Sequence, residues 1–231
     1  MTKHVVITGA NRGIGLGFVR HYLSQGDKVS ACCRQPSQAS ALIQLAEIYG
    51  NLNILQLDVT DDASVKALPQ HLNDHTIDIL INNAGYYGPK GEGVGQLHSA
   101  EWQKVLAINT IAPLMVTQIC YPMIQKATDA KVVFISSKMG SMGDNQSGGS
   151  YLYRSSKAGL NAAVKSLAID LSSEDIYCAI FHPGWVQTEM GGPNALLTVT
   201  EAVEQMTLCI EKLDSESSGK FLNYDGQVIP W

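Results

Sequence analysis

Short apolar segments rich in Val and Ile alternate with longer amphipathic segments along almost the whole chain, and this alternation limits the fold more than any other feature. The short segments read HVVIT, KVSACC, NILQLD, IDILINN, KVVFISS, YCAIFH and KFLNY, at residues 4–8, 28–33, 53–58, 77–83, 131–137, 177–182 and 220–224. Alternation of this kind is typical of βαβ units, in which helices cover both faces of a parallel sheet. The sequence therefore predicts an α/β fold with a doubly wound parallel sheet of about seven strands.

The length and composition of the chain fit one globular domain. A chain of 231 residues can bury one sizeable core but is short for two, so we expect a single domain over residues 1–231. Apolar residues make up 45% of the chain and charged residues 16%, which argues against a disordered or fibrous protein. The net charge is −5 and Lys and Arg form no run, so we expect no nucleic-acid partner.

The cysteines and the start of the sequence indicate a cellular compartment. The five cysteines are scattered and lack the CxxC spacing of a zinc or redox site, so we predict no metal site and expect small buried thiols in a reducing compartment. The first strand-like segment begins at residue 4, which leaves no room for a signal peptide, and no apolar run reaches the length of a bilayer. We therefore expect a cytoplasmic protein without a membrane partner.

A glycine-rich turn follows the first predicted strand. The segment TGANRGIGLGF at residues 8–18 leads into a helical pattern, and its glycines let backbone amides approach a pyrophosphate at the helix N-terminus. A turn that only packs tightly is the alternative, but the flanking strand and helix favour dinucleotide binding in a Rossmann-like fold. A P-loop is excluded because no GK[ST] follows the glycines. The candidate cofactor residues of this turn are Gly9, Asn11, Arg12, Gly13, Ile14 and Gly15.

The residue after the second predicted strand indicates which dinucleotide is bound. NAD-binding folds place an acidic residue there for the ribose hydroxyls, whereas this strand ends with Cys33 and is followed by Arg34. A guanidinium can pair with a 2′-phosphate, and Arg12 could assist it. We therefore predict that NADP(H) is preferred and that NAD(H) is possible. Alternatively, Arg34 only solvates the end of the strand.

Two tyrosines precede a lysine in YLYRSSKAG at residues 151–159, and apolar spacing predicts a helix over 158–171. On a helix, Tyr153 lies four residues before Lys157 and shares its face, whereas Tyr151 is rotated by about 240° from Lys157. A nearby ammonium favours the phenolate, so Lys157 is predicted to lower the pKa of Tyr153 and prepare it for acid–base catalysis. By themselves, a tyrosine and a lysine at this spacing could be chance packing.

A hydroxyl partner for Tyr153 is available at the end of another predicted strand. The segment FISSKMG at residues 134–140 places Ser136 and Ser137 at the carboxyl edge of the sheet, where ligands bind in open α/β folds. A serine hydroxyl there could hold the oxygen of a substrate carbonyl.

Together the motifs resemble the classical short-chain dehydrogenase/reductase family over nearly the whole chain. They are TGANRGIG (8–15), Asp58 in LDVTD, NNAG (82–85), Asn109 in AINT, ISSKMG (135–140), YRSSK (153–157) and HPGWVQT (182–188). The resemblance implies a catalytic tetrad of Asn109, Ser137, Tyr153 and Lys157, of which Tyr153 and Lys157 also contact the cofactor. It implies adenine contacts from Asp58 and Val59, ribose and ring contacts from Asn83, Ala84 and Gly85, nicotinamide contacts from Gly184, Val186 and Thr188, and Pro183 beside them.

Several of these assignments have alternatives. Asp58 could instead begin the next helix, although Thr60 and Asp61 are equally suited to cap it, and NNAG is also typical of a turn. Tyr153 lies 16 positions after Ser137, a longer gap than the family usually has, so a loop serine could replace Ser137. We favour Ser137 because Gly140 follows it in the family's SSxxG manner.

A proline interrupts the second long helical pattern, at residues 101–126. Pro113 cannot donate to the carbonyl oxygen of Asn109, so a kink is predicted and that oxygen loses its helical partner. In the family, the corresponding carbonyl holds a water that leads to the lysine. Alternatively, the kink only shapes the helix.

Within the family, the segments FHPGWVQTEMGG and FLNYDGQVIPW are most similar to sniffer-type and C-factor-like carbonyl reductases. The expected function is NADP(H)-dependent reduction of an aldehyde, ketone or quinone to an alcohol. The alternatives are an NADP(H)-binding signalling protein with little turnover and an NAD-linked alcohol dehydrogenase. An apolar or aromatic carbonyl is favoured by the candidate pocket residues Tyr86, Tyr87, Met139, Met142, Trp185 and Met190.

Two further features concern assembly. Small residues follow Lys157 on the predicted helix, at Ala158, Gly159, Ala162 and Ala163, and the family often associates through this helix. We therefore expect a homodimer or homotetramer. The apolar end of the chain, residues 228–231, is expected to pack onto the body of the protein or onto a neighbouring subunit, because exposing it to water is costly.

Overall fold

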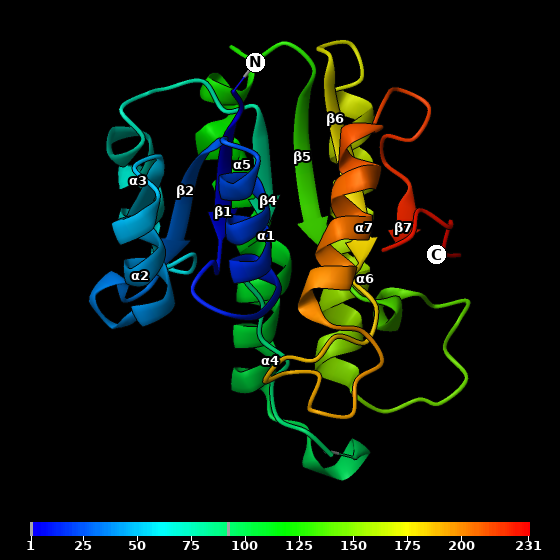
Figure 1. Cartoon of the computed structure of the whole chain (residues 1–231). Coiled ribbons are helices and arrows are strands. Elements are labelled where there is room, and N and C mark those ends of the chain that lie inside the picture. The colour runs from blue at the N-terminus through cyan, green and yellow to red at the C-terminus, as the bar shows by residue number, and fades with distance from the viewer. Residues whose placement is uncertain (1, 92) are drawn as a thin grey trace.

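The computed structural model describes residues 2–91 and 93–231 and has one parallel sheet at its centre (Figure 1). Its strands lie in the order β3-β2-β1-β4-β5-β6-β7, and their bounds are His4–Thr8 (β1), Lys28–Cys33 (β2), Leu52–Gln56 (β3), Ile79–Asn82 (β4), Ala130–Ile135 (β5), Ile176–His182 (β6) and Phe221–Asn223 (β7). The predicted doubly wound α/β fold with seven strands is therefore confirmed. β1 and β2 have the predicted limits, and the other strands differ from theirs by one or two residues at an end.

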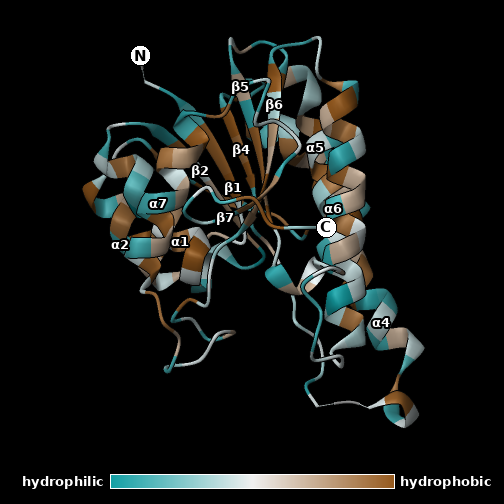
Figure 2. Cartoon of the chain, turned by 90° about the vertical axis from the view of Figure 1, so that its right-hand side faces the viewer, coloured by the Kyte–Doolittle hydropathy of each residue, from teal (hydrophilic) through white to brown (hydrophobic). Residues whose placement is uncertain are grey.

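Helices cover both faces of the sheet, as Figure 2 shows edge-on. One face carries α1 (Gly13–Ser24), α2 (Ser40–Ile48) and α7 (Val199–Glu211), and the other carries α3 (Asp62–His71), α5 (Ala112–Ile124) and α6 (Tyr151–Asp170). Each face has its own apolar core, because β-branched side chains point alternately to the two sides of the buried strands. Short 3₁₀ turns occupy Pro36–Gln38, Val94–Gln96 and Lys138–Gly140.

The predicted helix with the internal proline is present and has an unusual centre. Helix α4 (Ser99–Leu106) passes through a π-helical segment, Ala107–Ile111, into α5, and Pro113 lies at the start of α5. A residue that cannot donate a hydrogen bond disrupts the regular pattern, and the predicted disturbance at Asn109 is present as this wider turn.

The helix from Ser99 to Ile124 is also long and apolar enough to cross a membrane by length and composition, with a mean hydropathy of 1.4. The sequence analysis predicts no apolar segment long enough to cross a bilayer, and the helix from Ser99 to Ile124 differs from that prediction. Within the protein, α5 packs on the sheet, and its side chains Val116, Cys120 and Met123 are buried in the core. The buried helix of an α/β core meets the same test of length and apolarity.

The order of the strands reverses between β1 and β4, because the chain leaves β1 toward β2 and β3 and returns to β4 on the other side. In open parallel sheets, ligands bind at this switch point, outside the carboxyl ends of the strands. The loops after β1, β4, β5 and β6 all leave the sheet at that edge (Figure 1). They contain most of the residues that the sequence motifs single out.

Candidate active site

The turn after β1 is built to bring backbone close to a ligand. Gly9 and Gly13 adopt left-handed conformations with φ of +62° and +54°. A Cβ atom at Gly15 would lie 2.4 Å from the carbonyl oxygen of Gly9, so only glycine fits there. Helix α1 begins at Gly13 and leaves free amides at its N-terminus. This cradle fits the pyrophosphate of a dinucleotide, as the sequence predicts.

The NNAG segment after β4 holds the glycine turn in place. The Asn83 side-chain amide donates to the carbonyl oxygens of Thr8 and Gly9, at 2.9 and 3.0 Å. The Thr8 hydroxyl accepts from the backbone amides of Asn83 and Ala84, each at 3.0 Å. The Asn83 amide therefore positions the turn itself, a role that the motif alone did not reveal. Gly85 lies between this clamp and the side chains of Asn109 and Lys157.

The residues expected around the adenine lie after β2 and β3. Asp61 caps α3 by accepting from the amides of Ala63 and Ser64, so Asp58 is not needed as the cap. The Asp58 carboxylate accepts from the backbone amide and the hydroxyl of Thr60, which lowers its pKa, and the Arg34 guanidinium lowers it further. Arg34 is exposed at the end of β2, and Val59 packs at the margin of the core.

Arg12 has a partner that the sequence did not indicate. Its guanidinium forms an ion pair with Glu189, and both side chains are well exposed. The pair connects the glycine turn to the loop after β6, because Arg12 precedes α1 directly and Glu189 lies 177 positions later. Asn11 is exposed beside Arg12, and Ile14 is half-buried in the first turn of α1.

The loop after β6 approaches the same turn from the opposite side. Pro183 and Val186 are buried, and Gly184 has a φ of +85° with no room for a side chain because Leu197 lies 2.4 Å from the ideal Cβ position. The Thr188 methyl group lies 3.3 Å from the ideal Cβ position of Gly13. The residues expected to contact nicotinamide therefore lie next to the glycine turn.

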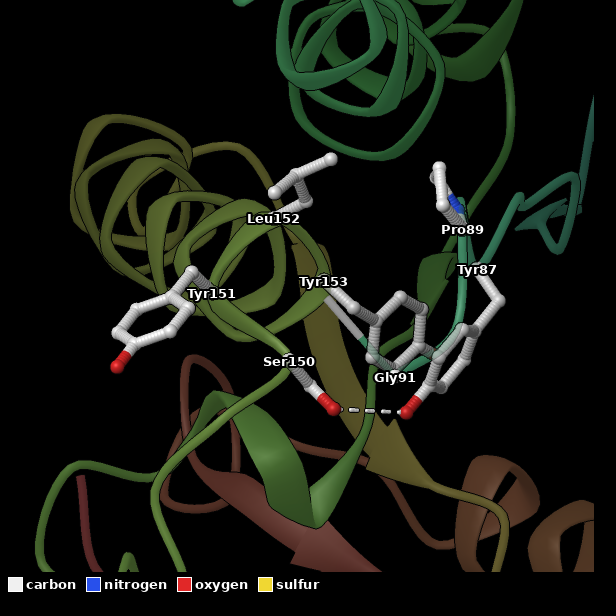
Figure 3. A pocket seen from close by; sticks show the side chains of 7 residues that line it. All are labelled: Tyr87, Pro89, Gly91, Ser150, Tyr151, Leu152 and Tyr153. Atoms are coloured by element: carbon white, nitrogen blue, oxygen red, sulfur yellow. Dashed lines mark hydrogen bonds between the residues drawn. The ribbon is translucent and has the colours of Figure 1, made fainter. Parts of the chain in front are cut away.

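Tyr153 and Lys157 lie on one face of α6 and are both buried. The Lys157 ammonium lies 5.7 Å from the centroid of the Tyr153 ring and donates to the carbonyl oxygen of Ile135 at 2.8 Å. Tyr151 is exposed, and its side chain points away from that of Tyr153 (Figure 3). The structure thus brings together the pair that helical spacing selects. Helix α6 starts at Tyr151, seven residues before the predicted helix.

The direction of the Tyr153 pKa shift differs from the prediction. Burial raises the pKa of Tyr153 to about 12, Tyr87 contributes to the rise, and the Ser137 hydroxyl acts in the opposite direction. Burial also lowers the pKa of Lys157 to about 8. The predicted lowering of the Tyr153 pKa is therefore wrong for this structure, because removal of the phenol from water raises the pKa by more than the Ser137 hydroxyl lowers it.

Ser137 is the serine that faces Tyr153. Its hydroxyl accepts from the backbone amide of Met139 at 3.1 Å and lies near enough to the phenol to affect its pKa. Ser136 points to the other side, where its hydroxyl donates to Asn161 at 2.6 Å. The loop serines have other partners: Ser141 donates to Pro230, Ser147 accepts from Arg154, and Ser150 contacts Tyr87.

Gly140, which the SSxxG pattern singles out, has a clear structural reason. A Cβ atom there would lie 2.9 Å from the backbone carbon of Lys157. The turn after Ser137 therefore packs directly against α6, which keeps Ser137 close to Tyr153.

Asn109 is fully buried and acts through its side chain. Its amide oxygen accepts from the backbone amide of Tyr86 at 2.8 Å, and its amide nitrogen donates to the Tyr86 carbonyl at 2.8 Å and to the Ser156 hydroxyl at 3.0 Å. Asn109 thereby joins the loop after β4 to α6. Ser156 is a part of this network that the sequence motifs did not single out.

The candidate pocket residues separate into three groups. Tyr87 stacks on Tyr153, and its hydroxyl lies 4.0 Å from the Met139 sulfur. Tyr86 instead turns its ring toward α4, where Lys104 lies 4.9 Å from the ring centroid, so its prediction as a pocket residue is wrong. The remaining candidates are largely exposed on the surrounding loops: Met142, Trp185 and Met190.

The structure also bears on a metal site and on His182. Among residues 2–91 and 93–231, no group of three or more His, Cys, Asp or Glu side chains could hold a metal ion. His182 is mostly buried at the end of β6, and burial lowers its pKa to about 4. It is therefore neutral at physiological pH.

Known proteins match the chain over its whole length. A family model for short chain dehydrogenases matches residues 3–196. The carbonyl reductase Sniffer of D. melanogaster superposes with a TM-score of 0.94 at 36% identity, and both chains are fully covered. An NADPH-bound carbonyl reductase from chicken fatty liver superposes with a TM-score of 0.93 at 38% identity, covering 100% of this chain and 99% of that one. The C-signal of Myxococcus xanthus is 41% identical over 67% of this chain and 93% of its own.

These matches agree with the parallel sheet and the glycine turn at its switch point, and they confirm the resemblance seen in the motifs, including the similarity to sniffer-type reductases. The chain belongs to the short-chain dehydrogenase/reductase family and is an oxidoreductase of carbonyl reductase type.

Proposed function

We propose that the protein reduces the carbonyl group of an apolar aldehyde, ketone or quinone to an alcohol with NADPH, using Tyr153, Ser137, Lys157 and Asn109. The observation that carries the proposal is the convergence of Tyr153, Lys157 and Ser137 beside a dinucleotide cradle at the switch point of the sheet. The NADPH-bound carbonyl reductase of chicken fatty liver, similar over the whole chain, supports it.

The residues divide the reaction among them. When bound, NADPH supplies a hydride to the carbonyl carbon and leaves as NADP⁺. The Ser137 hydroxyl donates a hydrogen bond to the carbonyl oxygen, and the Tyr153 phenol gives that oxygen its proton, so the carbonyl becomes an alcohol. Lys157 stabilises the phenolate that remains until a proton from solvent restores it. Asn109 holds the loop after β4 against α6, which keeps the side chains of α6 in position beside the cofactor site.

The raised pKa of Tyr153 agrees with its proposed role as the acid in carbonyl reduction. A phenol with a pKa of about 12 keeps its proton at neutral pH and is available as an acid. Oxidation of an alcohol would instead need the phenolate, which burial disfavours.

A panel of substrates tests the proposal. Wild-type protein is supplied with NADPH and a series of aldehydes, ketones and quinones, and loss of NADPH absorbance is recorded. We expect turnover of apolar members of the panel. Tight NADPH binding without turnover of any compound would contradict the enzymatic proposal. That result would favour an NADP(H)-binding signalling protein, an alternative made relevant by the similarity to C-signal of Myxococcus xanthus.

The preference for NADPH over NADH is a separate proposal that rests on Arg34. Arg34 lies exposed after β2 and close enough to Asp58 to affect its pKa, so it borders the expected adenosine site. Arg12 is paired with Glu189 and would have to leave that partner to assist. We expect kcat/KM to favour NADPH in the wild type and Arg34→Asp to reduce that preference by at least about tenfold. A wild type that favours NADH would overturn the assignment.

We also propose a homo-oligomer in the cytoplasm. Helices α5 and α6 expose apolar side chains, among them Met115 and Ile169, that a partner subunit could cover. Of the small residues on α6, Gly159 faces Thr110 of the same chain at 3.2 Å from its ideal Cβ position, and Ala162 is exposed. Light scattering that gives the mass of a monomer at all working concentrations would refute the oligomer.

A further inference from the structure

The residue before the proposed catalytic serine is anchored in the core. Ser136 directly follows β5, and its hydroxyl donates to the side-chain oxygen of Asn161 on α6 at 2.6 Å. Both side chains are buried, each with an exposed fraction of 2%. Successive side chains of an extended chain point to opposite sides, so an anchor on Ser136 directs Ser137 away from it, toward Tyr153.

Helix α6 holds the end of β5 at two successive residues. Lys157 donates to the carbonyl oxygen of Ile135 at 2.8 Å, and Asn161, about one helical turn later, accepts from Ser136. The Ser136 amide also donates to a carbonyl oxygen of β6 at 2.7 Å. The sheet therefore fixes the backbone before Ser137, and the helix that carries the proposed acid fixes the side chain.

The Ser136–Asn161 pair lies on a face of the sheet that is otherwise apolar. Phe134 of β5, with Leu160 and Val164 of α6, belongs to the core on this face. Two apolar side chains of similar shape would stabilise the protein nearly as well as a buried polar pair. A hydrogen bond, however, fixes a direction, whereas apolar contacts are non-directional. Position rather than stability is therefore what the pair supplies.

We propose that Asn161 is a positioning residue, which through Ser136 sets the place of the Ser137 hydroxyl beside the Tyr153 phenol. The inference rests on the proposed function and adds Asn161 and Ser136 to its site. A misplacement of about 1 Å near the reacting atoms can cost on the order of 100-fold in rate. Loss of the anchor should therefore reduce kcat without weakening NADPH binding.

A paired replacement separates position from stability. Ser136→Ala/Asn161→Leu removes both partners and leaves neither of them unpaired, so we expect the midpoint of urea unfolding to stay close to that of the wild type. The kcat for reduction of hexanal with NADPH should nevertheless fall by at least about tenfold, with an unchanged Kd for NADPH. A stable double variant with wild-type kcat would overturn the inference.

Ser30→Ala is the matched control, because it makes the same change at another buried serine. The Ser30 hydroxyl lies 2.9 Å from a ring nitrogen of His4, at the amino end of β1 and away from the edge that carries the site. Ser30→Ala and Ser136→Ala should both lower the midpoint of unfolding, and only Ser136→Ala should lower kcat. Equal losses of kcat in these two variants would contradict a positioning role.

A second comparison tests whether Asn161 acts through Ser137. Asn161→Leu should reduce kcat in the wild type but cause no further loss in Ser137→Ala, because the hydroxyl that it positions is already absent. If the two losses are additive, Asn161 acts on another group and the inference is wrong.

Crystal structures of the wild type and of Asn161→Leu test the inference without turnover. We expect the Ser137 hydroxyl to lie farther from the Tyr153 phenol in the variant, with α6 in the same place. An unchanged Ser137 would overturn the inference. Displacement of Ser137 in a protein whose wild type reduces no member of the carbonyl panel would reject the proposed function and leave the positioning role intact.

Discussion

At the scale of the residue, burial decides the chemistry of Tyr153 and Lys157. Both side chains are buried between α6 and the edge of the sheet. The loss of water raises the pKa of Tyr153 to about 12 and lowers the pKa of Lys157 to about 8. Each shift favours the uncharged form of the group. The phenol is consequently protonated at neutral pH, and the amine is close to its titration.

Tyr153 and Tyr151 provide a direct test of the assigned acid. Tyr153→Phe removes the hydroxyl but keeps the ring stacked on Tyr87, so we expect kcat to fall by about 10²–10⁴-fold with little change in the Kd of NADPH. Tyr151→Phe removes a hydroxyl that points away from the site and should keep most of the activity. Steady-state kinetics and fluorescence titration of NADPH measure both. Loss of activity in Tyr151→Phe with retention in Tyr153→Phe would reverse the assignment.

The pH dependence of reduction depends on Lys157. If the ammonium is needed, kcat/KM should be constant below about pH 8 and should fall about tenfold per unit above it, because Lys157 loses its charge there. Tyr153 does not cause this fall, since its pKa lies near 12 and it stays protonated throughout. Lys157→Arg keeps the charge at high pH and should remove the fall. A wild-type profile that stays flat to pH 10 would contradict the role of the ammonium.

At the scale of the element, the glycine turn and the NNAG segment form one unit. The turn after β1 and the loop after β4 are more than 70 residues apart, and the Asn83 amide joins them by two hydrogen bonds. Their strands are neighbours in the sheet, so the switch point places the two loops side by side. The cofactor cradle therefore depends on strand order as much as on glycine.

Gly15→Ala tests the cradle. The added methyl group would lie 2.4 Å from the Gly9 carbonyl oxygen and 2.5 Å from the Asn83 amide nitrogen, so both would have to move. We expect about 1–3 kcal/mol less stability and weaker NADPH binding. Urea unfolding and a fluorescence titration measure these two quantities. Gly50→Ala, where no atom lies within 4 Å, is the matched control and should leave NADPH binding unchanged. Equal effects of the two substitutions would argue against a tight cradle at Gly15.

At the scale of the whole molecule, residues 230 and 231 support the loop that leads to α6. The Trp231 carbonyl accepts from the amide of Gly143 at 2.8 Å, and the Pro230 carbonyl accepts from the Ser141 hydroxyl at 2.6 Å. The Trp231 ring stacks on Phe221 of β7, with centroids 5.9 Å apart. The expectation that this apolar segment packs onto the body of the protein is confirmed for Ile229, which is buried, and for the stacked face of Trp231, whereas Val228 is exposed.

Trp231→Ala tests that support. Loss of the stacked ring should lower the free energy of unfolding by about 1–2 kcal/mol and loosen the loop over residues 141–150. Chemical denaturation measures the first effect, and the rate of limited proteolysis within the loop measures the second. Trp231→Phe keeps an aromatic ring against Phe221. It should retain most of the free energy of unfolding and most of the resistance of the loop to proteolysis. If the rate of proteolysis within the loop is the same in the wild type and in both variants, Trp231 does not stabilise the loop.

The sequence by itself determined the succession of strands and helices along the chain, the glycine turn, and the pairing of Tyr153 rather than Tyr151 with Lys157. These features depend on residues close together in the chain, where the periods of strands and helices and the spacing of motifs are read directly. The single domain, the compartment and the oligomer stay predictions.

Only the tertiary structure decided which residues far apart in the sequence contact one another. It placed Ser137 rather than Ser136 beside the phenol, paired Arg12 with Glu189, and stacked Tyr87 on Tyr153. It also reversed the expected shift of the Tyr153 pKa. The reason is physical: burial and contact between segments set desolvation and pairing, and neither follows from spacing along the chain.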